Sequence, residues 1–280
     1  MGGTMDAMPV IPAAAAALHS RMESCLERDL FSLVIQPTVD FRTGCAFTGE
    51  ALSRLNHPVH GSISADVFIP NLDALGLCSK FDRYIFRKCC IWLYHAQEKG
   101  RRFDRITCNF SRKTLSQEGL ARDLIRIADS YGIPHHKLGV EIIERDQATD
   151  LRQFTENLRQ LKAAGFRIIL DDYGSGVTDE SELHSFPLDM VKLDRSLLLK
   201  TGTEKGAAEF RALVAKLIRL NVEVLCEGIE TEEQDSFARE AGCHYGQGFL
   251  YFRPVPQEHV FERIHQRFRN EAYPYPEPDI

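Results

Sequence analysis

The chain has 280 residues, of which 44% are hydrophobic and 26% are charged, and its formal net charge is -6. These values are typical of globular proteins and exclude a chain that is disordered or collagen-like throughout. Lysine and arginine form no basic block, so we expect no surface for duplex nucleic acid, which requires clustered positive charge. The length suits one large barrel or two ordinary domains.

Residues 1–30 are expected to form a leader that ends in a helix near residues 18–28. The alanine-rich part of this leader resembles a signal peptide, but Asp6 precedes it where positive charge is required. No later apolar run approaches the roughly 20 residues that span a bilayer, so no membrane association is expected. The eight cysteines include no C-x-x-C pair, which favours free thiols in a reducing cytoplasm over disulfides or a zinc site.

Short runs rich in β-forming residues then alternate with longer amphipathic runs, which is typical of βα units and a largely parallel sheet. The predicted strands cover residues 31–36, 46–51, 106–109, 138–143, 167–171, 190–193, 223–226 and 246–250. The predicted helices cover residues 79–99, 116–131, 150–164, 203–220, 232–241 and 256–269. Residues 40–44 are too few for a crossover helix, so the first two strands should pair antiparallel.

These elements predict an α/β fold: a modified TIM (β/α)8 barrel with one antiparallel strand near the N-terminus. The barrel domain is expected to cover residues 31–266, and residues 267–280 are expected to form a C-terminal tail. Several prolines in that tail are incompatible with a helix or a central strand.

Polar side chains stand at or near the predicted carboxyl ends of the strands, which form the rim where such barrels carry their active sites. They are Glu50, Asn109, Glu141, Asp171, Asp172, Lys192 and Glu227. Several carboxylates on one rim would repel each other strongly unless cations lay among them. Oxygen ligands without histidine favour Mg²⁺ or Mn²⁺, with Ca²⁺ as the competitor, and a bridging Asp171 would suit a two-metal site.

The order of these motifs resembles that of the EAL-domain cyclic di-GMP phosphodiesterases, over about residues 31–264. The matching motifs are Glu50-Ala51-Leu52 with Arg54, Asn109-Phe110-Ser111, Glu141-Ile142-Ile143-Glu144, Asp171-Asp172-Tyr173-Gly174, Lys192-Leu193-Asp194, Glu227-Gly228-Ile229-Glu230 and Gln247-Gly248. The resemblance implies hydrolysis of one phosphodiester of cyclic di-GMP, which gives linear pGpG. It also implies two Mg²⁺ or Mn²⁺ ions, with Ca²⁺ as an inhibitory competitor.

The resemblance further assigns a role to each matching residue. Glu50, Asn109, Glu141 and Asp171 would hold the first ion, and Asp171 would bridge to a second ion held with Asp172. Lys192 would position the attacking water, Glu227 would share in activating it, and Glu144 would anchor the loop that orients the aspartates. The residues expected to bind the substrate are Gln36, Leu52, Arg54, Glu230 and Gln247.

The loop over residues 173–180 departs from the family pattern. Val177 stands where the family has tyrosine, and Asp179 and Glu180 add negative charge near the expected metals. Ile143 also replaces a threonine beside Glu144. These departures leave open a catalytically weak or inactive module that binds cyclic di-GMP or a partner protein. A barrel that hydrolyses another phosphodiester is a third interpretation.

The resemblance suggests a homodimer. We expect no attached cyclase or sensor domain, and we expect regulatory input from a protein partner, from another site on the barrel or from the expression level.

Overall fold

The computed structural model describes residues 21–143, 148–175, 183 and 185–268. The strands are β1 (Phe31–Asp40), β2 (Thr48–His57), β3 (Gly61–Ser64), β4 (Arg105–Phe110), β5 (Leu138–Ile142), β6 (Arg167–Tyr173), β7 (Met190–Leu193), β8 (Glu223–Cys226), β9 (Tyr245–Gly246) and β10 (Val255–Pro256). The helices are α2 (Met22–Glu27), α3 (Ala65–Ala74), α4 (Cys78–Glu98), α5 (Arg112–Leu115), α6 (Leu120–Ser130), α7 (Leu151–Ala164), α9 (Arg195–Leu199), α10 (Glu204–Arg219), α11 (Glu232–Glu240) and α12 (Val260–Arg267), with 3-10 turns η1 (His135–Lys137) and η2 (Lys200–Gly202).

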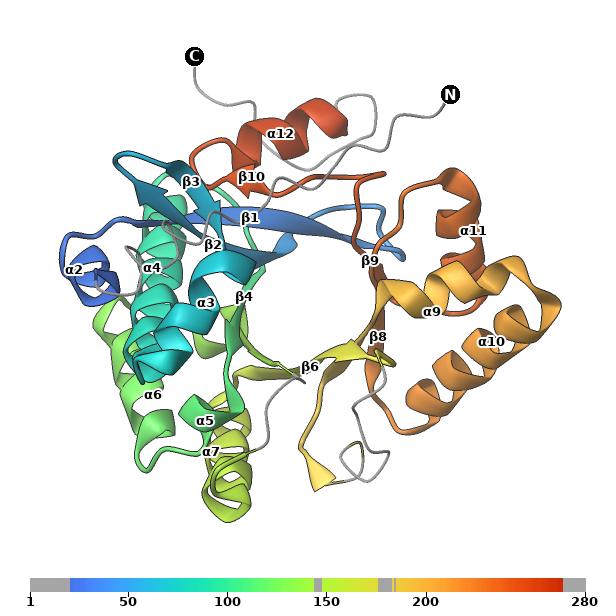
Figure 1. The fold of residues 1–280 in the computed structure, drawn as a ribbon. Helices are drawn as coiled ribbons and strands as arrows, with labels where there is room; N and C mark the ends of the chain where they lie inside the picture. Colours follow the sequence, from blue (N-terminus) through green and yellow to red (C-terminus); the bar gives the residue numbers. More distant parts are fainter. Residues whose placement is uncertain (1–20, 144–147, 176–182, 184, 269–280) are drawn as a thin grey trace, which may run out of the picture.

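The strands close into a barrel, which Figure 1 shows as a ring with helices outside it. Around the ring the order is β1, β9, β8, β7, β6, β5, β4 and β2, and the pairing of β1 with β2 completes the circle. β1 runs antiparallel to both of its neighbours in the ring, whereas the other neighbouring strands run parallel. The predicted α/β barrel with an antiparallel strand near the N-terminus is confirmed.

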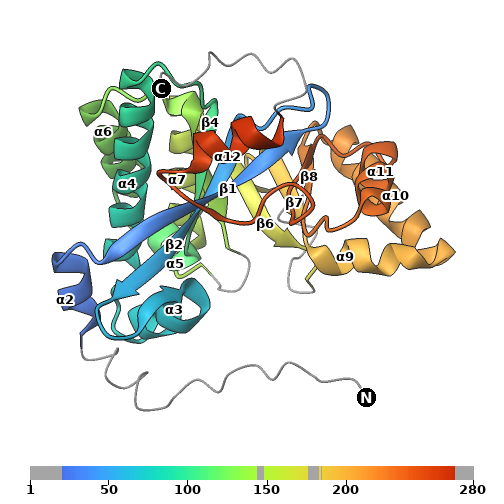
Figure 2. The same cartoon turned by 90° about the horizontal axis from the view of Figure 1, so that it is seen from above.

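The helices cover the barrel in two groups, with α4, α6 and α7 on one side and α10 and α11 on the other (Figures 1 and 2). α12 lies across β1, and the two views agree on this placement. Helix α2 contributes the buried Met22, Cys25 and Leu26 to the same hydrophobic core as the barrel. Among the described helices, none combines the length and the apolar character that a membrane crossing requires.

Local signals set several of the helix ends. The side chain of Asp150 accepts a hydrogen bond from the backbone N–H of Gln153 at the start of α7, and Gly165 ends that helix with a φ of 103°. At the start of α11, Thr231 and Gln234 form a reciprocal capping box. These caps explain why the sequence places the two helices to within a residue or two.

Several expected element bounds were wrong in part. The eighth strand comprises Tyr245–Gly246 and is shorter than the expected residues 246–250. The chain turns at Gly248, whose backbone lies so close to Ile229 that an added Cβ would be 2.1 Å from the carbonyl oxygen of Ile229. The last helix begins at Val260, because Val255 and Pro256 pair with β1. The antiparallel strand β3 and the helix α3 were not expected.

Asp82 of α4 supports the end of β4, because its carboxylate accepts hydrogen bonds from the backbone N–H and the hydroxyl of Ser111, at 3.1 and 3.2 Å. The residue is 7% exposed, and burial raises its pKa from 3.8 to about 6. The folded state therefore holds this proton more tightly than the unfolded state. The stability associated with the protonated form is present at low pH and is lost as the pH rises through about 6.

We expect Asp82→Asn to flatten the pH dependence of stability. Over the window from about pH 4 to pH 6, the free energy of unfolding of the wild type should fall relative to that of the variant by about 3 kcal/mol, at 1.36 kcal/mol for each pKa unit. Urea unfolding at a series of pH values measures this difference. Asp66→Asn, at an exposed position, is the control. Parallel curves for the Asp82 variant and the wild type would contradict the assignment.

Candidate metal centre and adjoining pocket

The polar side chains predicted at the strand ends meet at one end of the barrel. They come from successive strands: Glu50 (β2), Asn109 (β4), Glu141 (β5), Asp171 and Asp172 (β6), Lys192 (β7) and Glu227, directly after β8. These strands run parallel, so their carboxyl ends lie on one rim. The fold thereby brings residues far apart in the sequence into one polar centre.

The ammonium group of Lys192 lies among four carboxylates. Its Nζ is 2.9 Å from oxygens of Glu50, Glu141 and Glu227, and 2.8 Å from Asp171 Oδ1. The lysine side chain is 2% exposed, so these interactions are shielded from water. An ammonium group has three N–H donors, so the four carboxylates cannot all receive a full hydrogen bond from it. The centre carries more acidic groups than this single cation can neutralise.

Burial acts against the ionisation of three of these carboxylates. Burial and the neighbouring Glu50 raise the pKa of Glu141 well above its usual value. Burial likewise raises the pKa of Asp171 to about 6 and that of Glu227 to about 8, although Lys192 opposes both shifts. A buried carboxylate that lacks a full cationic partner favours its neutral form. An added cation at this centre would therefore favour the ionised carboxylates.

Glu50 and Lys192 form the charged pair that the centre stabilises best. Burial alone would raise the pKa of Glu50, but Lys192 and the amides of Asn109 and Gln247 lower it below its usual value. Burial would lower the pKa of Lys192, but the surrounding carboxylates, led by Asp171, raise it well above its usual value. Glu50 is thus ionised and Lys192 protonated near neutral pH.

The backbone of β6 presents two consecutive aspartates to the centre. The pairing of β6 with β7 shifts register between Leu170 and Tyr173, and Asp172 adopts a left-handed conformation with a φ of 56°. This conformation is rare for residues other than glycine, though aspartate tolerates it better than most. The irregularity breaks the strict alternation of a strand, so Asp171 and Asp172 both approach Glu227.

Two groups of carboxylates share Asp171. One oxygen from each of Glu50, Glu141 and Asp171 lies within 4.8 Å of the others, and the same holds for Asp171, Asp172 and Glu227. Two such groups with a common aspartate fit a pair of hard divalent cations bridged by that residue. The donor set consists of oxygens, which favours Mg²⁺, Mn²⁺ or Ca²⁺ over zinc.

Amide and hydroxyl groups of neighbouring residues donate hydrogen bonds to the carboxylates and orient them. Asn109 Nδ2 donates to Glu50 Oε1 at 2.7 Å, and the Thr107 hydroxyl donates to Glu141. Gln247 Nε2 donates to Glu50 Oε2 at 3.3 Å, while its buried Oε1 has no hydrogen-bond partner among the described residues. A buried amide oxygen without a donor is costly, so this atom suits a ligand or an ordered water.

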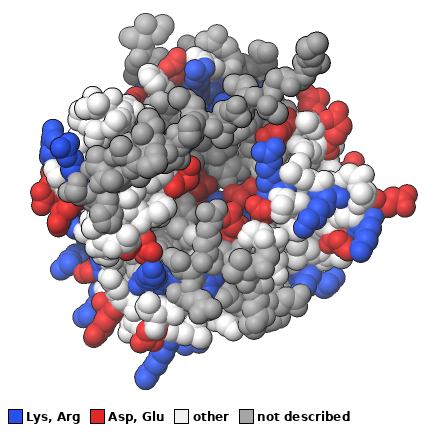
Figure 3. All heavy atoms as spheres, in the orientation of Figure 1, with Lys and Arg blue, Asp and Glu red and all other residues white. Residues whose placement is uncertain are grey.

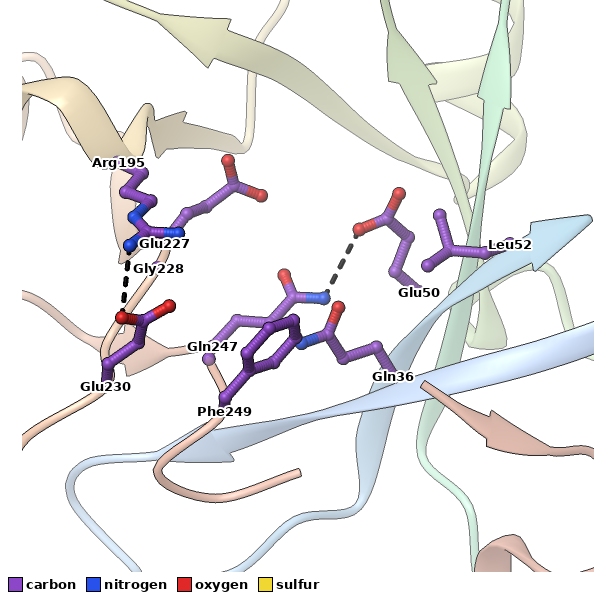
Figure 4. Close-up of a pocket in the computed structure, with 10 residues that line it drawn as sticks. Gln36, Glu50, Leu52, Arg195, Glu227, Gly228, Glu230, Gln247 and Phe249 are labelled. Atoms are coloured by element: carbon purple, nitrogen blue, oxygen red, sulfur yellow. Dashed lines mark hydrogen bonds and ion pairs between the residues drawn. The ribbon is translucent and has the colours of Figure 1, made fainter. Parts of the chain in front are cut away.

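A pocket of about 280 Å³ opens beside the carboxylate centre and contains Glu50, Glu227 and Gln247 in its lining (Figure 4). The rest of the lining consists of Gln36, Leu52, Arg195, Gly228, Glu230, Gly248 and Phe249. Acidic side chains gather near the middle of this face of the molecule (Figure 3). A ligand in the pocket would therefore contact the acidic centre directly.

The residues expected to bind the substrate differ in their positions. Gln36, Leu52, Glu230 and Gln247 line the pocket, and Gln36 Nε2 donates to the carbonyl oxygen of Phe252 at 3.1 Å. Arg54 lies further along β2, where its Nη1 donates to the carbonyl oxygen of Ser53 at 2.9 Å, and it is not in the pocket lining. Glu144 and the loop residues Val177, Asp179 and Glu180 lie outside the described residues, so the expectations for them stay predictions.

Two pocket residues were missed from the sequence. Arg195 follows the Lys192-Leu193-Asp194 motif directly, and Phe249 follows Gln247-Gly248. Their closeness to recognised motifs was the available signal. The sequence could not show that the two residues face the same pocket, because they come from segments that follow different strands.

Comparisons with known proteins find a matching family model and similar chains. A family model described as the EAL domain matches residues 19–254. The cyclic di-GMP phosphodiesterase NbdA of Pseudomonas aeruginosa is 28% identical over 258 residues, which are 92% of this chain and 33% of that protein. The chain spans about a third of the length of such curated relatives.

Solved structures show the same similarity. The PaMucR phosphodiesterase in complex with c-di-GMP superposes with a TM-score of 0.80 at 29% identity, over 87% of this chain and 99% of that chain. An EAL domain protein from Listeria monocytogenes gives a TM-score of 0.77 at 27% identity, over 94% and 99% of the two chains.

Proposed function

The chain belongs to the EAL domain family, and on this basis we propose that it is a metal-dependent phosphodiesterase that hydrolyses cyclic di-GMP to linear pGpG. The observation that carries the proposal is the pair of carboxylate groups joined by Asp171 at the edge of the pocket. A two-metal centre of this kind suits the displacement of an oxygen at phosphorus. The relative NbdA and the c-di-GMP complex of PaMucR support the choice of substrate.

The residues fit a pair of Mg²⁺ or Mn²⁺ ions. Glu50, Asn109, Glu141 and Asp171 would hold one ion, and Asp171 and Asp172, which lie near Glu227, would hold the other. When bound, the ions would act as Lewis acids on the phosphate and lower the pKa of water. Ca²⁺ would occupy the same oxygens with looser geometry, so we expect it to compete and inhibit.

Lys192 and Glu227 would orient the attacking water. Their side chains lie 2.9 Å apart at the edge of the group that contains Asp171 and Asp172. Glu227 would accept the proton of the water as its oxygen bonds to phosphorus. The phosphorus bond to the ribose 3′ oxygen would break, and that oxygen would take a proton from a water molecule to leave as the 3′-hydroxyl. Gln36, Leu52, Glu230 and Gln247, which line the pocket, would position the nucleotide, and Arg54 would contact it from further along β2. Glu144 would orient the aspartates through the loop that follows them.

A turnover assay tests the proposed function. The purified protein should convert cyclic di-GMP to pGpG with Mg²⁺ or Mn²⁺, lose this activity in excess chelator, and regain it when either ion is restored. Chromatographic detection of pGpG measures the reaction, and Ca²⁺ should lower the rate in the presence of Mg²⁺. Binding of cyclic di-GMP without product in either ion would instead identify an inactive binding module. Hydrolysis of other cyclic or linear dinucleotides alone would indicate a different substrate.

We place the protein in the cytoplasm, because the eight cysteines, which all lie within the described residues, form no disulfide bonds, including the buried Cys89, Cys90 and Cys108. A homodimer and a protein partner that supplies regulation remain part of the proposal. Size-exclusion chromatography with light scattering, with and without cyclic di-GMP, measures the oligomeric state.

A further inference from the structure

Arg195 stands at the edge of the pocket on a firmly placed stretch of chain. It is the first residue of α9 and lies three residues after the buried Lys192 of β7. The preceding Asp194 caps the helix, because its side chain accepts a hydrogen bond from the backbone N–H of Ser196 at 2.9 Å. The same chain segment therefore fixes both the centre of the acidic cluster and the guanidinium at the pocket edge.

The loop after β8 makes room for the arginine stem. Gly228 has a φ of 70°, and a Cβ added there would lie 2.4 to 2.8 Å from the Cβ, Cγ and Cδ atoms of Arg195. Any other residue at position 228 would displace the arginine or strain the backbone. The missing side chain of Gly228 thus leaves space for the Arg195 stem in the pocket wall.

Arg195 forms an ion pair with Glu230, which Figure 4 shows at the side of the pocket opposite Leu52. Arg195 Nη2 lies 3.0 Å from Glu230 Oε2, and the two side chains are 49% and 37% exposed. An ion pair this exposed contributes little to stability. Both side chains line the pocket, so a ligand there would meet hydrogen-bond donors and acceptors side by side.

The pair matches the edges of a guanine base. Guanine presents N–H donors at N1 and N2, which a carboxylate accepts, and acceptors at O6 and N7, which arginine contacts in its most common specific interaction with a base. A guanidinium has five N–H donors, so Arg195 keeps free donors while it holds Glu230. Adenine carries an amino group in place of O6 and an acceptor at N1. Its amino donor would therefore face the donors of Arg195, and its N1 acceptor would face the carboxylate of Glu230.

An aromatic ring completes the subsite. Phe249 is 46% exposed, lines the same pocket and lies near Gln247 in Figure 4. Arg253 lies over the ring, with its guanidinium 4.1 Å from the ring centroid. An exposed ring beside a hydrogen-bonding pair gives a base a surface on which to stack.

We propose that Arg195, acting with Glu230, selects guanine over adenine in the dinucleotide that the pocket binds. This inference rests on the proposed function, because it takes cyclic di-GMP as the ligand. It assigns to Arg195 a specificity role that the motifs leave unassigned. The guanidinium both orients the Glu230 carboxylate and donates to O6 or N7 of the base.

Calorimetric binding of cyclic di-GMP and cyclic di-AMP in Ca²⁺ tests the proposal. The wild type should prefer cyclic di-GMP, and Arg195→Met should weaken cyclic di-GMP binding by at least about tenfold with little change for cyclic di-AMP. Arg195→Lys should recover only part of the preference, because lysine lacks the planar fork. Under turnover with Mg²⁺, Arg195→Met should raise KM and leave kcat within about twofold.

Arg126→Met is the matched control, because Arg126 also pairs with a carboxylate, Asp123, at 2.9 Å but lies outside the pocket lining. It should leave both affinities unchanged. Unchanged cyclic di-GMP binding by Arg195→Met would overturn the proposal, and so would an equal loss for both dinucleotides, which would indicate a phosphate contact. Those results would leave the proposed function standing. A wild type that binds neither dinucleotide would overturn both the role of Arg195 and the proposed function, so the two failures give different results.

Discussion

Glu50→Gln should abolish hydrolysis of cyclic di-GMP, with kcat lower by at least about 10³-fold, or about 4 kcal/mol of activation free energy. Glu50 is the carboxylate that the centre keeps most firmly ionised, since Lys192, Asn109 and Gln247 all donate to it. Glutamine preserves the shape of the side chain but removes the charge that would bind a divalent ion. The amide would also bring its own N–H groups toward Lys192 or Gln247.

The measurement is pGpG formation at saturating Mg²⁺, together with the metal concentration that gives half-maximal activity. Glu209→Gln is the matched control, because its side chain is 64% exposed and its carboxylate contacts Lys205 on the surface. The control should behave as the wild type does. If Glu50→Gln kept more than a tenth of the wild-type kcat, the assignment of Glu50 as a metal ligand would be wrong.

The placement of the candidate metal ligands could be predicted because it follows from topology. Glu50, Asn109 and Glu141 belong to strands that neighbour each other in the ring, and parallel strands present their carboxyl ends on one rim. A strand pattern and the knowledge that the strands run parallel are enough to bring these side chains together. The shared position of Asp171 in two carboxylate groups follows from the tandem aspartates at the end of β6.

Other features depend on contacts that no local pattern contains. Helix α3 includes Pro70, which argues against a helix, yet Phe68 and Leu72 are fully buried and their packing outweighs that preference. Arg195 reaches the pocket because Gly228, in the loop after another strand, leaves space for its stem. These arrangements arise from packing between distant segments, so they had to be observed.

The position of Lys192 at the middle of the carboxylates could also not be predicted from the sequence. The motif predicted a lysine that positions water, but the structure shows an ammonium in contact with four carboxylates. Lys192 is therefore a structural cation as well as a candidate catalytic residue. This double role makes stability and metal binding at the centre interdependent.

Lys192→Met should destabilise the protein in chelator by about 3–5 kcal/mol near pH 7.5, because it removes the cation from a buried cluster and leaves the acids unpaired. The loss should be smaller near pH 5.5. In the wild type the pKa of Asp171 is about 6 and that of Glu227 about 8, and both would rise further without the lysine that lowers them. Protonation at lower pH then relieves the repulsion, so the difference from the wild type should grow as the pH rises.

Divalent ions should stabilise the Lys192→Met variant more than the wild type, because they would supply the positive charge that the variant lacks. Thermal and urea unfolding in chelator, Mg²⁺ and Mn²⁺ measure this, and the pGpG assay should still show loss of turnover, since the group that orients the water is gone. Lys162→Met is the control, because Lys162 pairs with the single carboxylate of Asp189 at 2.6 Å and its side chain is 37% exposed. Equal stabilisation of variant and wild type by the ions would show that the lysine and the metals do not share one cluster of charge.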